Sequence, residues 1–285
     1  MNTVKNGILD TEDLRIELPK IIDQLEKKFP YAHALFESEH GLSIAISSKE
    51  KSVSPLSPIR GLVLTACGEE GLQEVAVDRV SGADLTWATE ELLLRAAHSD
   101  SSVQVDPGPP LAADFTIRPI IDPKNVSLDD KIEACTSLEQ RLREYDSRVI
   151  SAGVSYSERW IDKFFVNRTR ILHQKLLLTT FAGRAVISDG STTRVARVGN
   201  SWSAGFEKVN VSDDEISESI DVAIRLLTAP RLTPGKYKII GGPMMAGVIA
   251  HEAFGHGVEA DLFLKNRAEA AKYLGKQVAS EIVDM

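Results

Sequence analysis

The chain has 285 residues, 43% hydrophobic and 26% charged, which is enough for one large or two ordinary domains with sizeable cores. Its net charge of −8 argues against a direct nucleic-acid partner, because nucleic-acid binders usually carry a basic face. Two cysteines are too few for a disulfide framework, and we expect a cytoplasmic protein because there is no apolar signal core and no run long enough to span a membrane.

The first hundred residues predict an α+β lobe, placed at 1–100. Apolar residues from Leu14 to Leu25 mark one helix face, with a kink or restart expected at Pro19. Two hairpins follow, and a helix closes the lobe. The strands are expected at 31–37, 42–47, 59–67 and 72–78, an exposed loop or strand edge at 47–58, and the helix at 83–98.

A proline-rich segment, 101–125, is interpreted as a linker or a long ordered excursion across the surface. The second α+β lobe, 126–232, begins and ends with helices whose capping signals start at Ser127 and Ser212. Between the helices, strands are expected at 148–155, 160–167, 170–181, 184–187 and 193–198.

The third region, 233–285, predicts a strand at 236–240, a Gly-Gly-Pro turn, and a helix beginning at Pro243. We expect this helix to enter a packed interior. The last residues, 277–283, are interpreted as another strand.

The most informative stretch is His251 to Asp261, HEAFGHGVEAD. Imidazole nitrogens beside a carboxylate are what a zinc hydrolase needs: ligands for the metal and a base for the attacking water. The histidines are five residues apart, which on an ideal helix leaves them about 140° apart. A π-bulge would bring them together, and Gly255 and Gly257 would make the distortion inexpensive.

For either histidine alone, a structural hydrogen bond is the preferred interpretation, and the whole combination shifts the balance towards a metal site. His251 and His256 are then the zinc ligands, and Glu252 is the general base. Glu259 and Asp261 have two interpretations of equal weight: partners that orient a ligand, or a solvated face. A ligand role for Glu259 ranks lower.

With its apolar lead-in, this motif resembles the TldD/PmbA family of zinc metallopeptidases, also called modulators of DNA gyrase. The intact HExxxH resembles the catalytic TldD branch rather than the PmbA (TldE) branch, which lacks the zinc motif and acts as a partner. The resemblance implies an α+β fold in which an N-terminal α/β region of two helix-plus-antiparallel-sheet lobes precedes a mostly β, zinc-bearing domain. It also implies small or unfolded peptide substrates bound as extended strands, and assembly with a TldE/PmbA-like paralogue or as a homodimer.

The resemblance further implies a third zinc ligand, a cysteine far downstream of the histidines. Cys67 and Cys135 lie upstream and are expected to be small buried hydrophobes. We therefore expect that ligand beyond Met285, and the chain to match about two-thirds of a family member.

Two other functions compete with the peptidase. A non-catalytic binding or scaffold fragment is motivated by the missing third ligand and the missing downstream sheet, and metal analysis separates it from a peptidase. A DNA-associated regulator is disfavoured by the charge. The other histidines, His33, His40, His98 and His173, are expected to be structural or exposed; His173 has added interest because the resemblance implies that strands line the substrate tunnel.

Overall fold

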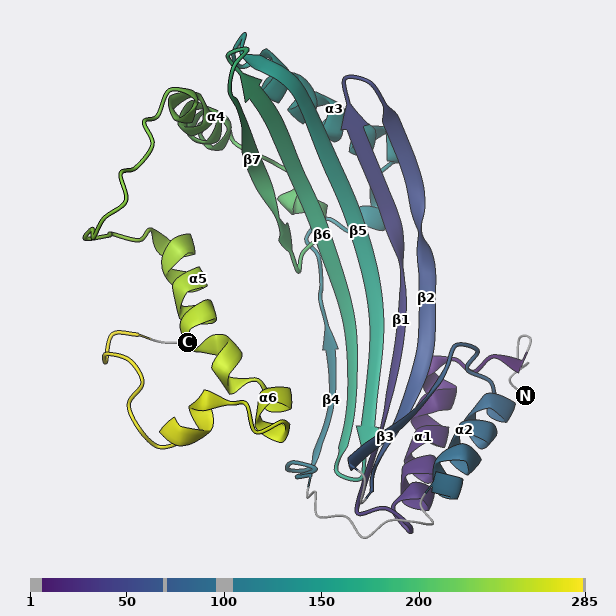
Figure 1. The fold of residues 1–285 in the computed structure, drawn as a ribbon. Coiled ribbons are helices and arrows are strands. Elements are labelled where there is room, and N and C mark those ends of the chain that lie inside the picture. Colours follow the sequence, from purple (N-terminus) through teal and green to yellow (C-terminus); the bar gives the residue numbers. More distant parts are fainter. Residues whose placement is uncertain (1–6, 69–70, 96–104, 284–285) are drawn as a thin grey trace. The chain divides into compact units, whose positions relative to one another are not determined.

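The computed structural model describes residues 7–68, 71–95 and 105–283. The chain divides into two compact units, Met1–Ala229 and Pro230–Met285, and each is described by itself (Figure 1). The strands are β1 (Tyr31–Ser47), β2 (Lys51–Gly68), β3 (Gly71–Val77), β4 (Leu111–Thr116), β5 (Val149–Asn167), β6 (Arg170–Ser188) and β7 (Thr193–Trp202). The helices are α1 (Thr11–Leu25), α2 (Gly82–Arg95), α3 (Leu128–Glu144), α4 (Asp213–Leu227), α5 (Pro243–Ala253) and α6 (Ala260–Leu264).

The strands of the first unit form one sheet in the order β3-β2-β1-β5-β6-β4, with β7 also paired to β6. Every pair is antiparallel except β4 and β6, which run parallel. The α+β class is confirmed, but the separate sheets expected for two lobes are wrong. Strands β1 and β5, from the two expected lobes, pair along their lengths from His33↔Asn167 to Ser47↔Gly153. The boundaries at 100, 125 and 232 stay predictions.

Three expected strand breaks do not occur. The segments expected at 31–37 and 42–47 form one strand, β1. Likewise, the two strands expected on either side of 156–159 form the single strand β5, and the two on either side of 182–183 form the single strand β6. Two glycines that suggest turns have another purpose. A Cβ on Gly41 would lie 2.0 Å from the Glu158 carbonyl oxygen, and one on Gly183 would lie 2.6 Å from Leu142 of α3. They permit close approach within continuous strands.

Of the two alternatives for 47–58, an exposed loop or a strand edge, the structure has the strand edge, because most of the segment is the first half of β2. This half pairs with β1 on one side only, so it is an edge strand, where the missing N–H groups of Pro55 and Pro58 are tolerated. The hairpin joining β2 to β3 is confirmed. In the proline-rich segment, residues 105–125 are an ordered excursion that contains β4.

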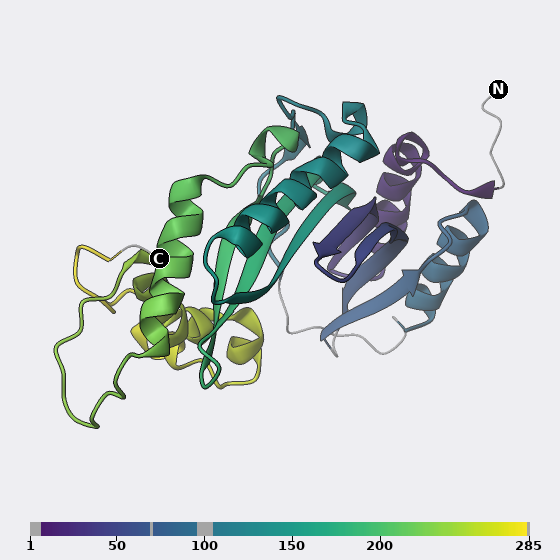
Figure 2. The ribbon, with the colours of Figure 1, turned by 90° about the horizontal axis from the view of Figure 1, so that it is seen from above.

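The four helices of the first unit cover one face of the sheet. On β1, the even-numbered Ala34 and Phe36 pack with α1 and α2, and the even-numbered Ile44 and Ile46 pack in the cluster that α3 and α4 cover. Because alternate side chains point to opposite faces, both clusters lie on the same face. Figure 2 shows α3 lying across the strands. These helices leave the other face of the sheet uncovered.

Local signals explain where the helices begin. Asp10 caps α1 in a capping box with Asp13, while Ser127 and Ser212 cap α3 and α4 through their side chains. Helix α1 is continuous through Pro19, so the expected restart does not occur. The expected helix at 83–98 is α2, and His98 lies outside the described residues.

A buried ionic group fixes α3 to the sheet. Lys131 Nζ lies 2.8 Å from Glu158 Oε2, and the Tyr156 hydroxyl donates to the same oxygen at 2.5 Å. Lys131 and Glu158 are both more than nine-tenths buried. Cys135 lies in the same core, where burial raises the pKa of its thiol to about 12; Cys67 is buried too, as expected for both cysteines.

The outer edge of β7 is occupied by side chains of α4. The backbone N–H of Arg197 donates to Ser219 Oγ, which in turn donates to the Arg197 carbonyl, and the N–H of Gly199 donates to Glu215. These are the backbone positions that another strand would use, so α4 closes this part of the sheet edge.

In the second unit, the described residues contain helices and turns but no strand. The strands expected at 236–240 and 277–283 are therefore wrong, because their alternating apolar residues have no strand to pair with in the described part of this unit. Helix α5 was expected to enter a packed interior, yet it has no buried residue, and Met244 is 85% exposed. Among the described residues, no helix is long and apolar enough to cross a membrane.

Candidate metal centre

The candidate centre lies where helix α5 ends. His251 is in the last turn of α5, and the helix stops at Phe254, whose φ of −140° is outside the helical range. A 3-10 helix, Gly255–Val258, follows at once and carries His256. The expected π-bulge is wrong: the chain leaves the helix between the two histidines instead of inserting a residue into it.

This break brings the two imidazoles together. Their ring centroids are 4.5 Å apart, with the ring planes at 75°. Glu252 completes the group, with Oε2 at 3.6 Å from Nε2 of His256. One ligand atom from each of His251, Glu252 and His256 lies within 4.8 Å of the others. The three residues that the motif singled out are thus neighbours in space, and all three are exposed.

Glu259 contacts the second histidine. Its Oε1 lies 2.8 Å from Nδ1 of His256, so a carboxylate accepts the Nδ1–H and leaves Nε2 as the free nitrogen of the neutral ring. This hydrogen bond and the Glu259 charge, with a smaller contribution from Glu252, raise the pKa of His256. Glu259 thus occupies the position of an orienting partner and is not in the converging group.

Asp261 faces another residue. Its Oδ2 lies 2.7 Å from Nζ of Lys265, four residues along the chain, and this hydrogen bond lowers the pKa of the carboxyl. Asp261 is therefore engaged in a surface ion pair of α6 rather than with either histidine.

The donor set fits a zinc ion (Zn2+). Imidazole nitrogen and carboxylate oxygen are both among the ligands that zinc takes in proteins, and the Glu259 carboxylate fixes the tautomer of the His256 ring. Neither Cys67 nor Cys135 belongs to the group.

His173 lies elsewhere, in the sheet. It is buried, with Nε2 at 2.6 Å from Asp162 Oδ1 and Nδ1 at 3.3 Å from the guanidinium of Arg15. These contacts join α1, β5 and β6, which is a structural role. Sequence reasoning did not find this network, because its members are distant along the chain and only the strand register places them together.

Comparison with known protein families identifies two matching domains in this chain. Residues 121–228 match the PmbA/TldA metallopeptidase central domain, and residues 234–285 match the PmbA/TldA metallopeptidase C-terminal domain. The two segments together cover more than half of the chain. The chain belongs to the PmbA/TldD metallopeptidase family. The C-terminal match contains the whole HEAFGHGVEAD stretch.

The relatives of this family member include proteins named metalloproteases. One from Synechocystis is 24% identical over 89% of this chain and 55% of its own length. Another, from Methanocaldococcus jannaschii, is 30% identical over 57% of this chain and 36% of its own length. The chain thus spans about half or less of the length of these relatives.

Solved structures agree on the fold. A Bacteroides thetaiotaomicron protein named as a candidate modulator of DNA gyrase aligns with a TM-score of 0.75 at 17% identity, covering 95% of this chain and 62% of that one. TldE from Thermococcus kodakarensis aligns with a TM-score of 0.66 at 16% identity, covering 94% and 60%. At these identities the likeness shows the fold alone.

Proposed function

We propose that this chain carries the zinc-holding part of a TldD-type peptidase, with His251 and His256 as metal ligands and Glu252 as general base. The observation that carries the proposal is the convergence of these three side chains within 4.8 Å, at a helix end, in a member of a metallopeptidase family.

Bound zinc would supply a Lewis acid that activates water and polarises the peptide carbonyl. In this proposal Glu252 accepts the proton of the attacking water, a role supported by its position next to one ligand in the sequence and by its carboxylate at 3.6 Å from the free nitrogen of the other. It then passes that proton to the leaving amine. Glu259 holds the His256 ring so that Nε2 faces the group.

The substrates proposed are small or unfolded peptides, bound as extended strands through main-chain hydrogen bonds. Extended binding suits a peptidase of broad specificity, because the backbone is common to all peptides. A TldE/PmbA-like paralogue, or a second copy of the chain, is the proposed partner.

The test is Glu252→Gln, made in the full-length gene product and assayed with zinc content beside peptide cleavage. We expect cleavage to fall by at least a hundredfold while stoichiometric zinc remains, because the amide keeps the shape of the carboxylate but cannot take a proton. Asp261→Asn is the matched control, since Asp261 is paired with Lys265. Equal cleavage by Glu252→Gln and wild type would refute the assignment of the base.

A non-catalytic scaffold is the second candidate, favoured by the exposure of the group and by the lack of any buried residue in helix α5. Zinc analysis of the purified chain separates the two candidates. Tightly held, stoichiometric zinc supports the peptidase, and a metal lost on dialysis supports the scaffold.

A further inference from the structure

A hollow lies on the uncovered face of the sheet, close to the turn between β1 and β2. Its volume is about 560 Å³. The register places small residues side by side across four strands, which leaves the space open. These residues are Ala45 on β1, Ser155 on β5, Ala182 on β6 and Gly199 on β7.

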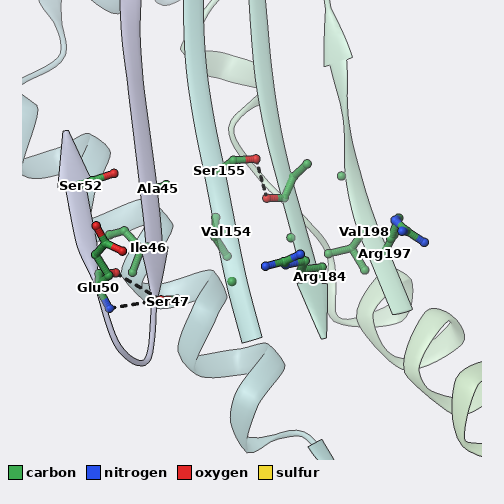
Figure 3. A pocket seen from close by; sticks show the side chains of 14 residues that line it. Ala45, Ile46, Ser47, Glu50, Ser52, Val154, Ser155, Arg184, Arg197 and Val198 are labelled. Atoms are coloured by element: carbon green, nitrogen blue, oxygen red, sulfur yellow. Dashed lines mark hydrogen bonds between the residues drawn. The ribbon is translucent and has the colours of Figure 1, made fainter. Parts of the chain in front are cut away.

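The two sides of the hollow carry opposite charges. Glu50 lies at one side, and Arg184 and Arg197 lie at the other, with β1 and β5 between them (Figure 3). Within the described part of the chain, none of these three groups forms an ion pair, although Arg159 and Lys163 in the same sheet each have a carboxylate partner.

Arg184 and Arg197 are directly opposite each other on β6 and β7. Like charges at opposite positions destabilise a sheet, and here no carboxylate of the described residues neutralises them. The Arg184 side chain leans over β5, where its Nε would lie 3.7 Å from a Cβ on Gly153. An anion in the hollow would give Arg184 the partner that no carboxylate of the described residues supplies.

We propose that this hollow binds a short zwitterionic peptide, with its carboxylate at Arg184 and its ammonium group at Glu50. Strands are spaced by about 4.8 Å, so the distance from the β1–β2 turn to a guanidinium above β5 or β6 is about one and a half to two and a half spacings, roughly 7–12 Å. An extended chain covers about 3.3–3.6 Å per residue. The ligand that spans the two charges therefore has two or three residues.

The small residues of the floor allow such a peptide to lie against the sheet without displacing a side chain. Arginine suits a carboxylate, because its planar N–H groups can donate two parallel hydrogen bonds. This site is in the first unit and uses none of the residues assigned to zinc, so it goes beyond the proposed function and can fail independently of it.

The test is calorimetric titration of the chain, with a chelator present to prevent cleavage, using three probes. They are trialanine, N-acetyl-trialanine, which lacks the ammonium group, and trialanine amide, which lacks the carboxylate. We expect trialanine to bind about tenfold more tightly than either blocked form, the size of effect that one charge-assisted hydrogen bond gives.

Two variants connect the probes to the residues. Arg184→Gln is expected to bind trialanine and its amide equally, because the partner of the carboxylate is gone; Glu50→Gln is expected to bind trialanine and its acetylated form equally. Arg194→Gln is the matched control, as Arg194 is an exposed arginine of β7 on the other face of that strand. It should bind like the wild type.

Ala182→Leu fills the floor of the hollow and should abolish binding of all three probes, with unchanged circular dichroism as the check on folding. Equal affinity for the three probes, no binding of trialanine, or the same affinity in Arg184→Gln as in Arg194→Gln would each overturn the proposal.

Discussion

The hydrogen bond from His256 to Glu259 gives the sharpest prediction for the metal centre. Glu259→Gln removes the charge but keeps the size of the side chain. Partners that orient a metal-bound histidine usually affect metal affinity by 10–100-fold. Here the bond is 2.8 Å long, but both side chains are 49% exposed, so water competes for it. We therefore expect the lower end of the range, a loss of about tenfold in zinc affinity at pH 8.

The pH dependence supplies an independent check. Glu259 raises the pKa of His256 above its ordinary value of 6.5, first by its hydrogen bond and then by its charge. A protonated imidazole cannot bind zinc, so affinity is lost as the pH falls through this pKa. In Glu259→Gln the pKa drops and the loss begins at lower pH. The tenfold difference in zinc affinity between the variant and the wild type should therefore become smaller as the pH falls.

Competition with a chromophoric chelator between pH 8 and 5.5 measures both effects. Asp261→Asn should follow the wild-type curve, since Asp261 pairs with Lys265. Equal zinc affinity of Glu259→Gln and wild type at pH 8, or a difference that widens as the pH falls, would refute the orienting role.

Two predictions concern the sheet. Lys131→Met should lower the free energy of unfolding by about 3 kcal/mol in urea titrations, because it leaves the Glu158 carboxylate buried without its cation. Adding Glu158→Gln should recover part of this loss, and equal stability of the single and double variants would contradict the reasoning. Gly199 and Gly190 both have positive φ, at 83° and 91°, but a Cβ on Gly199 would lie 2.1 Å from the Phe181 carbonyl oxygen, whereas one on Gly190 would meet nothing within 4 Å. Gly190→Ala should therefore cost about 1 kcal/mol and Gly199→Ala clearly more, and similar thermal midpoints would show that the close contact is unimportant.

The sequence predicted helices better than strands. Capping residues such as Ser127 and Ser212 act within one turn, so the starts of α3 and α4 could be read locally. The continuity of β1 and β6 could not, because Gly41 and Gly183 have the same appearance in a sequence whether they form a turn or admit a neighbouring backbone or helix. Only the partner across the sheet distinguishes the two.

The strand pairing that connects the two expected lobes into one sheet was missed for a similar reason. The pairing of β1 with β5 connects residues more than a hundred positions apart, and no local pattern specifies which strands become neighbours. The opposite error occurred at 236–240, where an alternating apolar pattern predicted a strand. Ile240 is fully exposed there, which shows that alternation alone does not make a strand without a partner.

The candidate centre was predicted in its residues but not in its backbone. The prediction of a metal site rests on the chemistry of histidine, glutamate and histidine, which can be read from the sequence without tertiary information. How the chain compensates for five-residue spacing depends on where the helix ends, and Phe254 carries no signal that would favour an end over a bulge.

The bonds from α4 to the edge of β7 also bear on the order of events during synthesis. Residues 193–202 leave the ribosome before 213–227, so for a short time β7 displays its outward N–H groups to other nascent chains. Ser219 supplies both a donor and an acceptor to one residue of that edge. In a Ser219→Ala chain the core would be unchanged, but the N–H and carbonyl of Arg197 would lose their partner on α4. At high expression rates, more of the newly made protein would then aggregate than its loss of stability explains.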